Sequence, residues 1–286
     1  MKKVLLLSSL AVSGVILAGC GSGGSTGGVT LDTLLEESNK VMDSVKSVST
    51  NINIDVEMDM SASTGGNDTS FEIKMTGEGV LEAVLDNFAA HQVMNMNVSL
   101  YNVDQASSTE TYMIADANNS KKVDVYTNSV SNDAESGWSH TSMDMEDASQ
   151  KLNFNLYNLY TNSKDSFSLE KKTKQFEGSE CYVVNAKLRF KDIASYVGES
   201  LSQLNVDENS DLKIDTVYYI DKETKEVKGA EVDMGDTMKS LLEESAQQSS
   251  NKGIKINIKA FKVTSENTYN TVTSIDIPKE VTEAAN

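Results

Sequence analysis

Few side chains in this 286-residue chain could act as a nucleophile or as a base near neutral pH. The chain has two cysteines, Cys20 and Cys181, and two histidines, His91 and His140. Ser139 adjoins His140, but neighbouring side chains on a strand point to opposite faces, so they would not form a nucleophile–base pair. Cys181 lies in an apolar run without a neighbouring histidine. This setting predicts a buried structural thiol rather than a reactive one.

Carboxylates are abundant, but they follow no metal-binding or catalytic motif. Neither an H-E-x-x-H nor a C-x-x-C sequence occurs. Residues 207–211 begin like a calcium loop, but Leu212 replaces its glycine and Tyr218 replaces its bidentate glutamate. We therefore predict a non-catalytic protein with no metal and no cofactor. A glycosidase-like carboxylate pair stays open as an alternative, because composition alone does not exclude one.

Cys20 stands at the end of a segment that has the three parts of an export signal. Lys2 and Lys3 give it a positive start, residues 4–17 are apolar or small, and two small residues precede Cys20. The apolar stretch is shorter than the roughly 20 residues of a membrane span. This order predicts a signal peptide over residues 1–19. The alternative is an ordinary secretory signal followed by a chance cysteine.

The run Leu17-Ala18-Gly19-Cys20 resembles the lipobox of bacterial lipoproteins. In that family the signal is removed and the cysteine thiol carries a thioether-linked diacylglycerol. The resemblance implies that Cys20 is the lipid attachment site. It also implies that the mature protein is anchored to the cell membrane on its extracytoplasmic face. Two acyl chains anchor a protein stably, since each buried methylene contributes about 0.8 kcal/mol.

The residues after Cys20 predict a flexible tether, residues 20–29. Residues 21–28 are all Gly, Ser or Thr, and eight residues of such coil reach roughly 16 Å. Residues 19–24 match G-x-G-x-x-G and residues 23–27 match G-x-S-x-G. Both motifs require a strand and a helix around them. A flexible linker has neither, so we interpret these matches as products of low complexity.

The charge of the chain excludes several kinds of partner. Loss of residues 1–19 removes two lysines and no acid, so the formal charge changes from −18 to −20. A basic footprint for nucleic acid is therefore absent. Attraction to anionic lipid headgroups is not expected either, because no polybasic segment occurs. The acidity favours a monomer, and the length suits a single domain over residues 30–286.

Alternation of apolar and polar residues predicts a chain rich in strands. Residues 51–60 give the clearest pattern, with one apolar face and one acidic face that we interpret as solvated, because its carboxylates would not converge on a metal. Further strands are predicted at residues 71–75, 94–100, 111–115, 123–127, 167–169, 180–188, 212–220, 227–234, 254–261 and 271–277. Helical spacing covers residues 31–48, 193–204 and 238–246, and residues 146–162 fit either type. Because strands and helices do not alternate, this pattern favours an antiparallel sheet with one covered face.

Several short pieces resemble Gram-positive lipoproteins of the LolA/LppX-like fold. They are the opening helix with strand 51–60, Val123-Asp124-Val125-Tyr126 leading to Gly137-Trp138, the hairpin at 218–224, and the closing residues 275–281. The resemblance implies an α+β fold in which a curved, incompletely closed antiparallel sheet, a half-barrel, wraps a few helices. It also implies a hydrophobic cavity between sheet and helices, which holds lipid or acyl chains in characterised relatives.

Apolar residues on the predicted inward strand faces are the candidate lining of such a cavity. Methionine is frequent among them, and it fills irregular space at adaptable binding surfaces. The ten candidates are Ile54, Val56, Met58, Met60, Phe71, Ile73, Met75, Met94, Met96 and Val98. The alternative is that they are plain core residues.

The sequence as a whole predicts a lipoprotein that binds a lipid or another hydrophobic ligand without catalysis. An envelope protein that binds another protein, or a structural lipoprotein without a small ligand, is the alternative. In that case the acidic faces and the polar loops at residues 61–69 and 129–136 would be the contact surfaces.

Overall fold

The computed structural model describes residues 26–64, 67–100, 103–132, 134, 137–152, 155–189, 212–248 and 254–285. The predicted signal peptide, Cys20 and most of the tether lie outside these ranges. The helix predicted at residues 193–204 and the calcium-like residues 207–211 also lie outside them. No helix in the described ranges is long and apolar enough to span a membrane.

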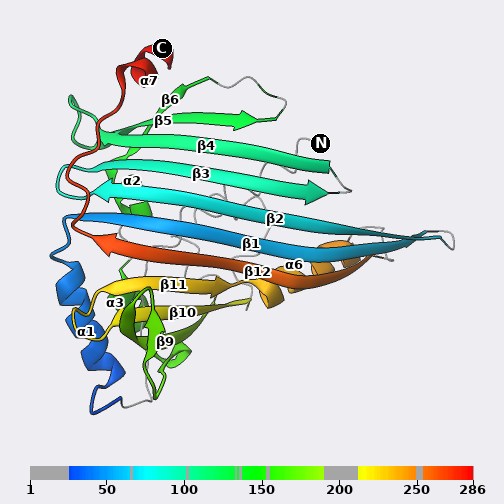
Figure 1. Cartoon of the computed structure of the whole chain (residues 1–286), viewed down its shortest axis with the longest axis horizontal. Helices are drawn as coiled ribbons and strands as arrows, with labels where there is room; N and C mark the ends of the chain where they lie inside the picture. The colour runs from blue at the N-terminus through cyan, green and yellow to red at the C-terminus, as the bar shows by residue number, and fades with distance from the viewer. Residues whose placement is uncertain are drawn as a thin grey trace.

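A single antiparallel sheet of twelve strands forms the body of the molecule (Figure 1). Eleven strands follow the order β6-β5-β4-β3-β2-β1-β12-β11-β10-β9-β7, and β8 pairs with β9. The strands are β1 Ser47–Thr64, β2 Asn67–Val84, β3 Ala89–Leu100, β4 Val103–Ala115, β5 Lys122–Ser131, β6 Ser139–Asp144, β7 Phe167–Leu169, β8 Lys174–Phe176, β9 Ser179–Arg189, β10 Lys213–Asp221, β11 Val227–Asp233 and β12 Ile254–Tyr269. The end strands β6 and β7 are not joined along this path, so the sheet is open. The predicted fold class is therefore confirmed.

The first helix, α1 Leu31–Met42, begins where the sequence predicts. Thr30 caps it, because its side chain accepts from the Thr33 N–H and the Thr33 side chain accepts in return from the Thr30 N–H. The helix ends six residues earlier than predicted. A turn closed by the hydrogen bond from the Val45 N–H to the Met42 carbonyl leads directly into β1. Val45 and Val48 are buried nonetheless, the first in this turn and the second in β1.

Residues 146–162, which fit either type of element, form two short helices. These are α2 Met145–Leu152 and α3 Leu156–Asn162, where Asn155 caps α3 by accepting from the Asn158 N–H. A 3-10 turn, η1 Lys164–Ser166, leads from α3 into β7. The remaining helices are α6 Gly235–Gln248 and α7 Lys279–Ala284.

The strand predicted at residues 271–277 is wrong. These residues follow β12, which is already paired on one side with β1 and on the other with β11. Residues 271–278 therefore run outside the sheet with no strand partner and lead into α7, where Pro278 is the cap residue rather than a strand end. β4 is longer than predicted, and β6 was not predicted, because both carry mostly polar residues.

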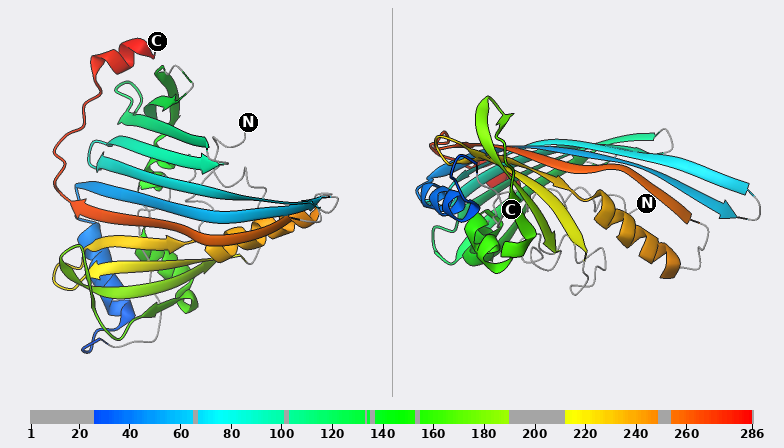
Figure 2. Two further views of the ribbon diagram at one scale, coloured as in Figure 1. Left: turned by 45° about the vertical axis from the view of Figure 1, so that its right-hand side comes forward. Right: turned by 90° about the horizontal axis from the view of Figure 1, so that it is seen from below.

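The core consists of two clusters on the face of the sheet where the helices lie (Figure 2). The first cluster joins α1 and α3 to β7, β9, β10 and β11, with Leu34 and Tyr160 among its most buried members. The second joins β1, β2, β3 and β12 to Met238 of α6. Met42, Val232 and Met234 are half-buried and pack against both clusters. They connect the two halves of the core.

Candidate hydrophobic binding face

The ten candidate lining residues share one face of β1, β2 and β3. Nine of them belong to or pack against the second core cluster. Phe71 is the tenth; it is half-buried and lies opposite Met60 in the register of β1 and β2. The structure thus brings together the side chains that the alternation placed on one side. We call this surface the apolar face.

Strand register arranges the apolar face in rows that cross the three strands. Val56 of β1 lies opposite Met75 of β2, which lies opposite Val98 of β3. In the next row, Met58 lies opposite Ile73. Rows continue into β12, where Val56 pairs with Phe261. Such cross-strand neighbours are close enough for their side chains to contact.

Burial along the apolar face decreases toward the free end of the β1–β2 hairpin. On β1, Val56 and Met58 are buried whereas Met60 is half-buried. On β2 and β3, Met75 and Met96 are likewise buried, whereas the residues nearer that end are half-buried; these are Ile73, Phe71, Val98 and Leu100. The decrease occurs on three adjacent strands, so the far end exposes a continuous apolar surface.

Two glycines of β2 shape this face, although neither is among the residues predicted to line it. Gly77 lies between Ile54 of β1 and Met96 of β3 in register. A Cβ atom at Gly77 would overlap the Met96 sulfur and approach Ile54 Cδ1 to 3.2 Å, and one at Gly79 would lie 2.6 Å from Met94 Cε. The two methionine side chains therefore lie across the glycines. The signal was the G-x-G spacing inside a strand, where glycine often marks such a close approach.

The opposite face of the same strands is charged, as predicted, and three of its carboxylates converge on one lysine. Lys259 of β12 places its Nζ 2.8 Å from Glu57, 2.8 Å from Glu72 and 2.9 Å from Asp59. Convergence arises because the acids come from two neighbouring strands and a cation lies between them. Hydrogen bonds from Lys259 lower the pKa of Asp59 and Glu72, and those to Glu57, Glu72 and Asp59 raise the pKa of Lys259.

Both histidines are held by carboxylates on strands β3 to β6. His91 Nε2 lies 2.9 Å from Glu110 Oε1, and its ring stacks on Tyr112 at 4.2 Å. Burial and the hydrogen bond to Glu110 raise the pKa of Tyr112 to about 12. These contacts give His91 a structural setting between two neighbouring strands.

His140 Nε2 lies 2.8 Å from Asp124 Oδ1, and its ring stacks on Tyr126 at 4.7 Å. Ser139 donates its hydroxyl to the Thr127 carbonyl instead of contacting His140. The prediction that the two neighbours do not pair is therefore confirmed.

Cys181 is fully buried on β9, as its apolar run predicted. It packs with Val183 and Tyr219 in a small cluster separate from the two main ones. Burial, followed by the nearby Asp221 charge, raises the pKa of its thiol to about 11. The thiolate is therefore suppressed near neutral pH.

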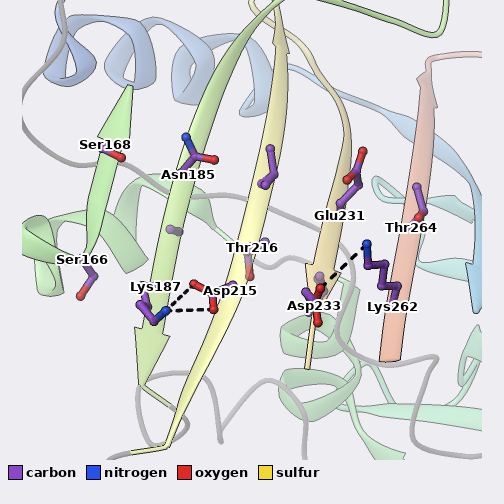
Figure 3. A pocket seen from close by; sticks show the side chains of 13 residues that line it. Ser166, Ser168, Asn185, Lys187, Asp215, Thr216, Glu231, Asp233, Lys262 and Thr264 are labelled. Carbon is purple, nitrogen blue, oxygen red and sulfur yellow. Dashed lines mark hydrogen bonds and ion pairs between the residues drawn. The ribbon is translucent and has the colours of Figure 1, made fainter. Parts of the chain in front are cut away.

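A polar groove of about 350 Å³ crosses β9, β10, β11 and β12 (Figure 3). Four of its five charged side chains form pairs, because Lys187 lies 3.0 Å from Asp215 and Lys262 lies 4.0 Å from Asp233. The fifth, Glu231, accepts a hydrogen bond from the Tyr219 hydroxyl. Lys187, Asp215, Asp233 and Lys262 follow one another in register across the four strands. A paired charge ladder of this kind suits a solvated sheet face, not an apolar ligand.

No group of three or more His, Cys, Asp or Glu side chains suitable for a metal occurs within the described ranges. The three carboxylates at Lys259 already have a cation between them.

A family model described as "Family of unknown function (DUF6612)" matches residues 30–286 of the chain. None of the curated proteins compared with the chain matches it. LprF from Mycobacterium bovis is similar in structure with 10% identity and a TM-score of 0.41, over 86% of this chain and 96% of that one.

Two further solved structures align over most of both chains. A beta-barrel-like DUF1849 protein from Brucella abortus has 10% identity and a TM-score of 0.29, over 79% of this chain and 99% of that one. A domain described as an outer membrane lipoprotein-sorting protein, from Vibrio parahaemolyticus, has 7% identity and a TM-score of 0.23, over 85% of this chain and 93% of that one. At these scores the alignments assign no ligand, partner or activity to this chain.

Proposed function

We propose that this chain, which belongs to the DUF6612 family of unknown function, is a lipid-anchored binding protein. Its lipid is attached at Cys20, and its domain works at the extracytoplasmic face of the cell membrane. The domain binds a lipid or another hydrophobic ligand on the apolar face and carries out no catalysis. One observation carries the binding proposal: the apolar side chains of three adjacent strands become half-buried toward the same end.

The chemistry of this end suits an acyl chain. Burying apolar surface stabilises a complex by about 25 cal/mol per Å², or about 0.8 kcal/mol for each methylene. Met60, Ile73 and Val98 offer such surface without a charged group among them. Ligand sites for apolar molecules are lined mostly by hydrophobic side chains. The paired polar groove offers no comparable surface.

Methionine adds adaptability to the buried end of the face. Met94 and Met96 lie across Gly79 and Gly77, and methionine is unbranched with several rotatable bonds. Methionine side chains repack easily around ligands of different shape. The face would therefore accept a class of hydrophobic chains rather than one rigid ligand.

Native mass spectrometry after purification without detergent tests the binding proposal. We expect a bound species of lipid mass and uptake of a fluorescent fatty acid. Ile73→Asp should abolish uptake, because it puts a charge on the apolar face. Asn97→Asp puts the same charge on an exposed position of the opposite face and should leave uptake intact. A protein that is uniformly empty and takes up no probe would refute the proposal and favour a plain core.

The anchor is tested separately by metabolic labelling with a palmitate analogue. We expect label on the wild type and none on Cys20→Ala, whose protein should leave the membrane fraction or remain unprocessed. Cys181→Ala is the matched control, because that thiol is buried and should not affect labelling. Equal labelling of wild type and Cys20→Ala would contradict the anchor.

A further inference from the structure

A lysine-lined hollow lies where the described chain begins. It has a volume of about 470 Å³, and it is lined by Thr26, Gly27, Val29, Lys171, Lys172, Thr173, Tyr182 and Lys222. Lys171 and Lys172 come from the bend between β7 and β8, and Lys222 comes from the turn between β10 and β11. Three cations and no carboxylate line it, although the chain as a whole has 43 acidic and 25 basic residues.

Two of the three lysine charges of the hollow are available to a ligand. Lys171 and Lys172 are exposed and have no ion-pair partner within the described part of the chain. Lys222 Nζ lies 2.8 Å from Glu180, which also accepts from Thr173 at 2.6 Å. Thr26 is fixed against this wall, because its hydroxyl donates to the Glu170 carbonyl at 2.9 Å. The hollow thus combines two ammonium groups that have no ion-pair partner among the described residues with a backbone segment held in place at Thr26.

The position of the hollow relative to Cys20 indicates which surface the hollow would contact. Five residues lie between Cys20 and Thr26, and a Gly/Ser-type chain of six Cα–Cα steps spans roughly 13 Å on average. An anchor at Cys20 would hold the hollow close to the lipid headgroups. At that range lysines are attracted to anionic lipids, since the surface potential extends about one Debye length from the bilayer.

We propose that this hollow binds the phosphate groups of anionic lipid headgroups and orients the domain on its own membrane. The proposal rests on the proposed anchor at Cys20. It also revises the expectation from the sequence that headgroup attraction is absent, because the lysines come from two turns about 50 residues apart and form no polybasic segment.

Lysine footprinting on tethered protein tests this orientation. The mature chain, residues 20–286, is coupled through the Cys20 thiol to a maleimide lipid, since Cys181 is buried and spared. Acetylation rates are compared on phosphatidylcholine vesicles with and without phosphatidylglycerol. We expect phosphatidylglycerol to slow acetylation of Lys171 and Lys172 by roughly threefold or more. Lys239 of α6 and Lys255 of β12, both exposed elsewhere, should not change.

Two variants with the same charge change separate a local site from general electrostatics. K171E/K172E should abolish the protection of Lys222 by phosphatidylglycerol, whereas K239E/K255E should preserve it. Equal loss in both variants, or no protection in the wild type, would overturn the proposal. Inorganic phosphate at matched ionic strength forms a third arm. If it protects Lys171 and Lys172 of untethered protein as strongly as the vesicles do, the site takes free phosphate rather than the membrane.

The result does not depend on lipidation in the cell, because the tether is attached chemically. Failure of palmitate labelling with retained footprinting would therefore refute the anchor and leave the headgroup site. Labelling without protection would refute the headgroup site alone.

Discussion

At the scale of single residues, the apolar face depends on glycine as much as on methionine. Met96 has room only because Gly77 has no side chain beneath its sulfur. Glycine inside a strand weakens the strand through its entropy and its lack of packing. The two glycines of β2 therefore weaken the strand but leave space for the methionine side chains of β3.

Gly77→Ala should test that relation. The added Cβ overlaps the Met96 sulfur and crowds Ile54, so we expect a loss of about 1–3 kcal/mol in the free energy of unfolding. Urea denaturation measures it. Gly137→Ala is the matched control, because nothing lies within 4 Å of a Cβ there. In a Met96→Ala background the cost of Gly77→Ala should shrink, and an unchanged cost would show that the overlap is not its cause.

Cys181 gives a prediction about pH. Its thiol pKa rises from 9.0 to about 11 in the folded protein, because burial disfavours the thiolate. Between these values the unfolded chain loses a proton that the folded chain keeps. The buried, protonated thiol therefore adds to the free energy of unfolding below pH 9, and this contribution is lost as the pH rises toward 11. Relative to Cys181→Ala, the free energy of unfolding of the wild type should fall by up to about 2–3 kcal/mol over this pH range.

Thiol labelling provides the accompanying control for this residue. In a Cys20→Ser protein, Cys181 is the remaining cysteine. It should resist a thiol reagent at pH 7 in the native state and react fully in guanidinium. Rapid native labelling at pH 7 would contradict both its burial and the raised pKa.

At the scale of elements, Lys259 links the outer face of three strands. Its ammonium group contacts acids on both β1 and β2 from its place on β12. Without it, three carboxylates would repel one another across neighbouring strands. Exposed ion pairs contribute little one by one, but a shared cation among several acids is a network.

Lys259→Gln should therefore destabilise the protein in a pH-dependent way. The lowered pKa values of Asp59 and Glu72 mean that their contribution is present above about pH 4 and is lost as the pH falls below it. The difference between variant and wild type in urea midpoint should be largest near pH 7 and shrink at pH 3. Lys262→Gln, whose Nζ lies 4.0 Å from Asp233, is the control and should show a smaller effect. An equal difference at both pH values would contradict the network.

Elements were predicted from the sequence wherever one face is apolar. Strand β1 alternates strongly, β9 and β10 contain apolar runs, and the cap at Thr30 marks the start of α1. The polar part of β4 was missed, because its pairing with β3 and β5, not its side chains, makes it a strand. The strand prediction for residues 271–277 was wrong for the converse reason. These residues alternate, but both edges of β12, the strand they follow, are already paired.

The candidate site could likewise be predicted from the sequence only in part. The ten lining residues could be found from period-two alternation, because a strand has only two faces. The role of Gly77 depends on which residue of β3 lies opposite, and the lysine hollow depends on two distant turns meeting. Register and the meeting of distant turns are tertiary properties that alternation within one segment does not contain.

At the scale of the whole molecule, the open sheet carries two main core clusters that differ in burial. The first cluster packs α1 and α3 against β7, β9, β10 and β11, and its Tyr182 also lines the lysine hollow. The cluster of β1, β2 and β3 contains the half-buried apolar end. Half-buried residues connect the two, so the packed half can hold the other half in place while its face takes a ligand.

This division predicts where a ligand stabilises the protein. A ligand that binds only the folded state stabilises the region it contacts in proportion to its occupancy. Hydrogen exchange with and without a saturating fatty acid should therefore slow amide exchange in β1, β2 and β3 by roughly tenfold or more, with little change in β9 and β10. Ile73→Asp should abolish the protection, and Asn97→Asp should retain it. Protection confined to β9 and β10 would move the ligand to the other core, because the apolar end of β1–β3 would then have bound nothing.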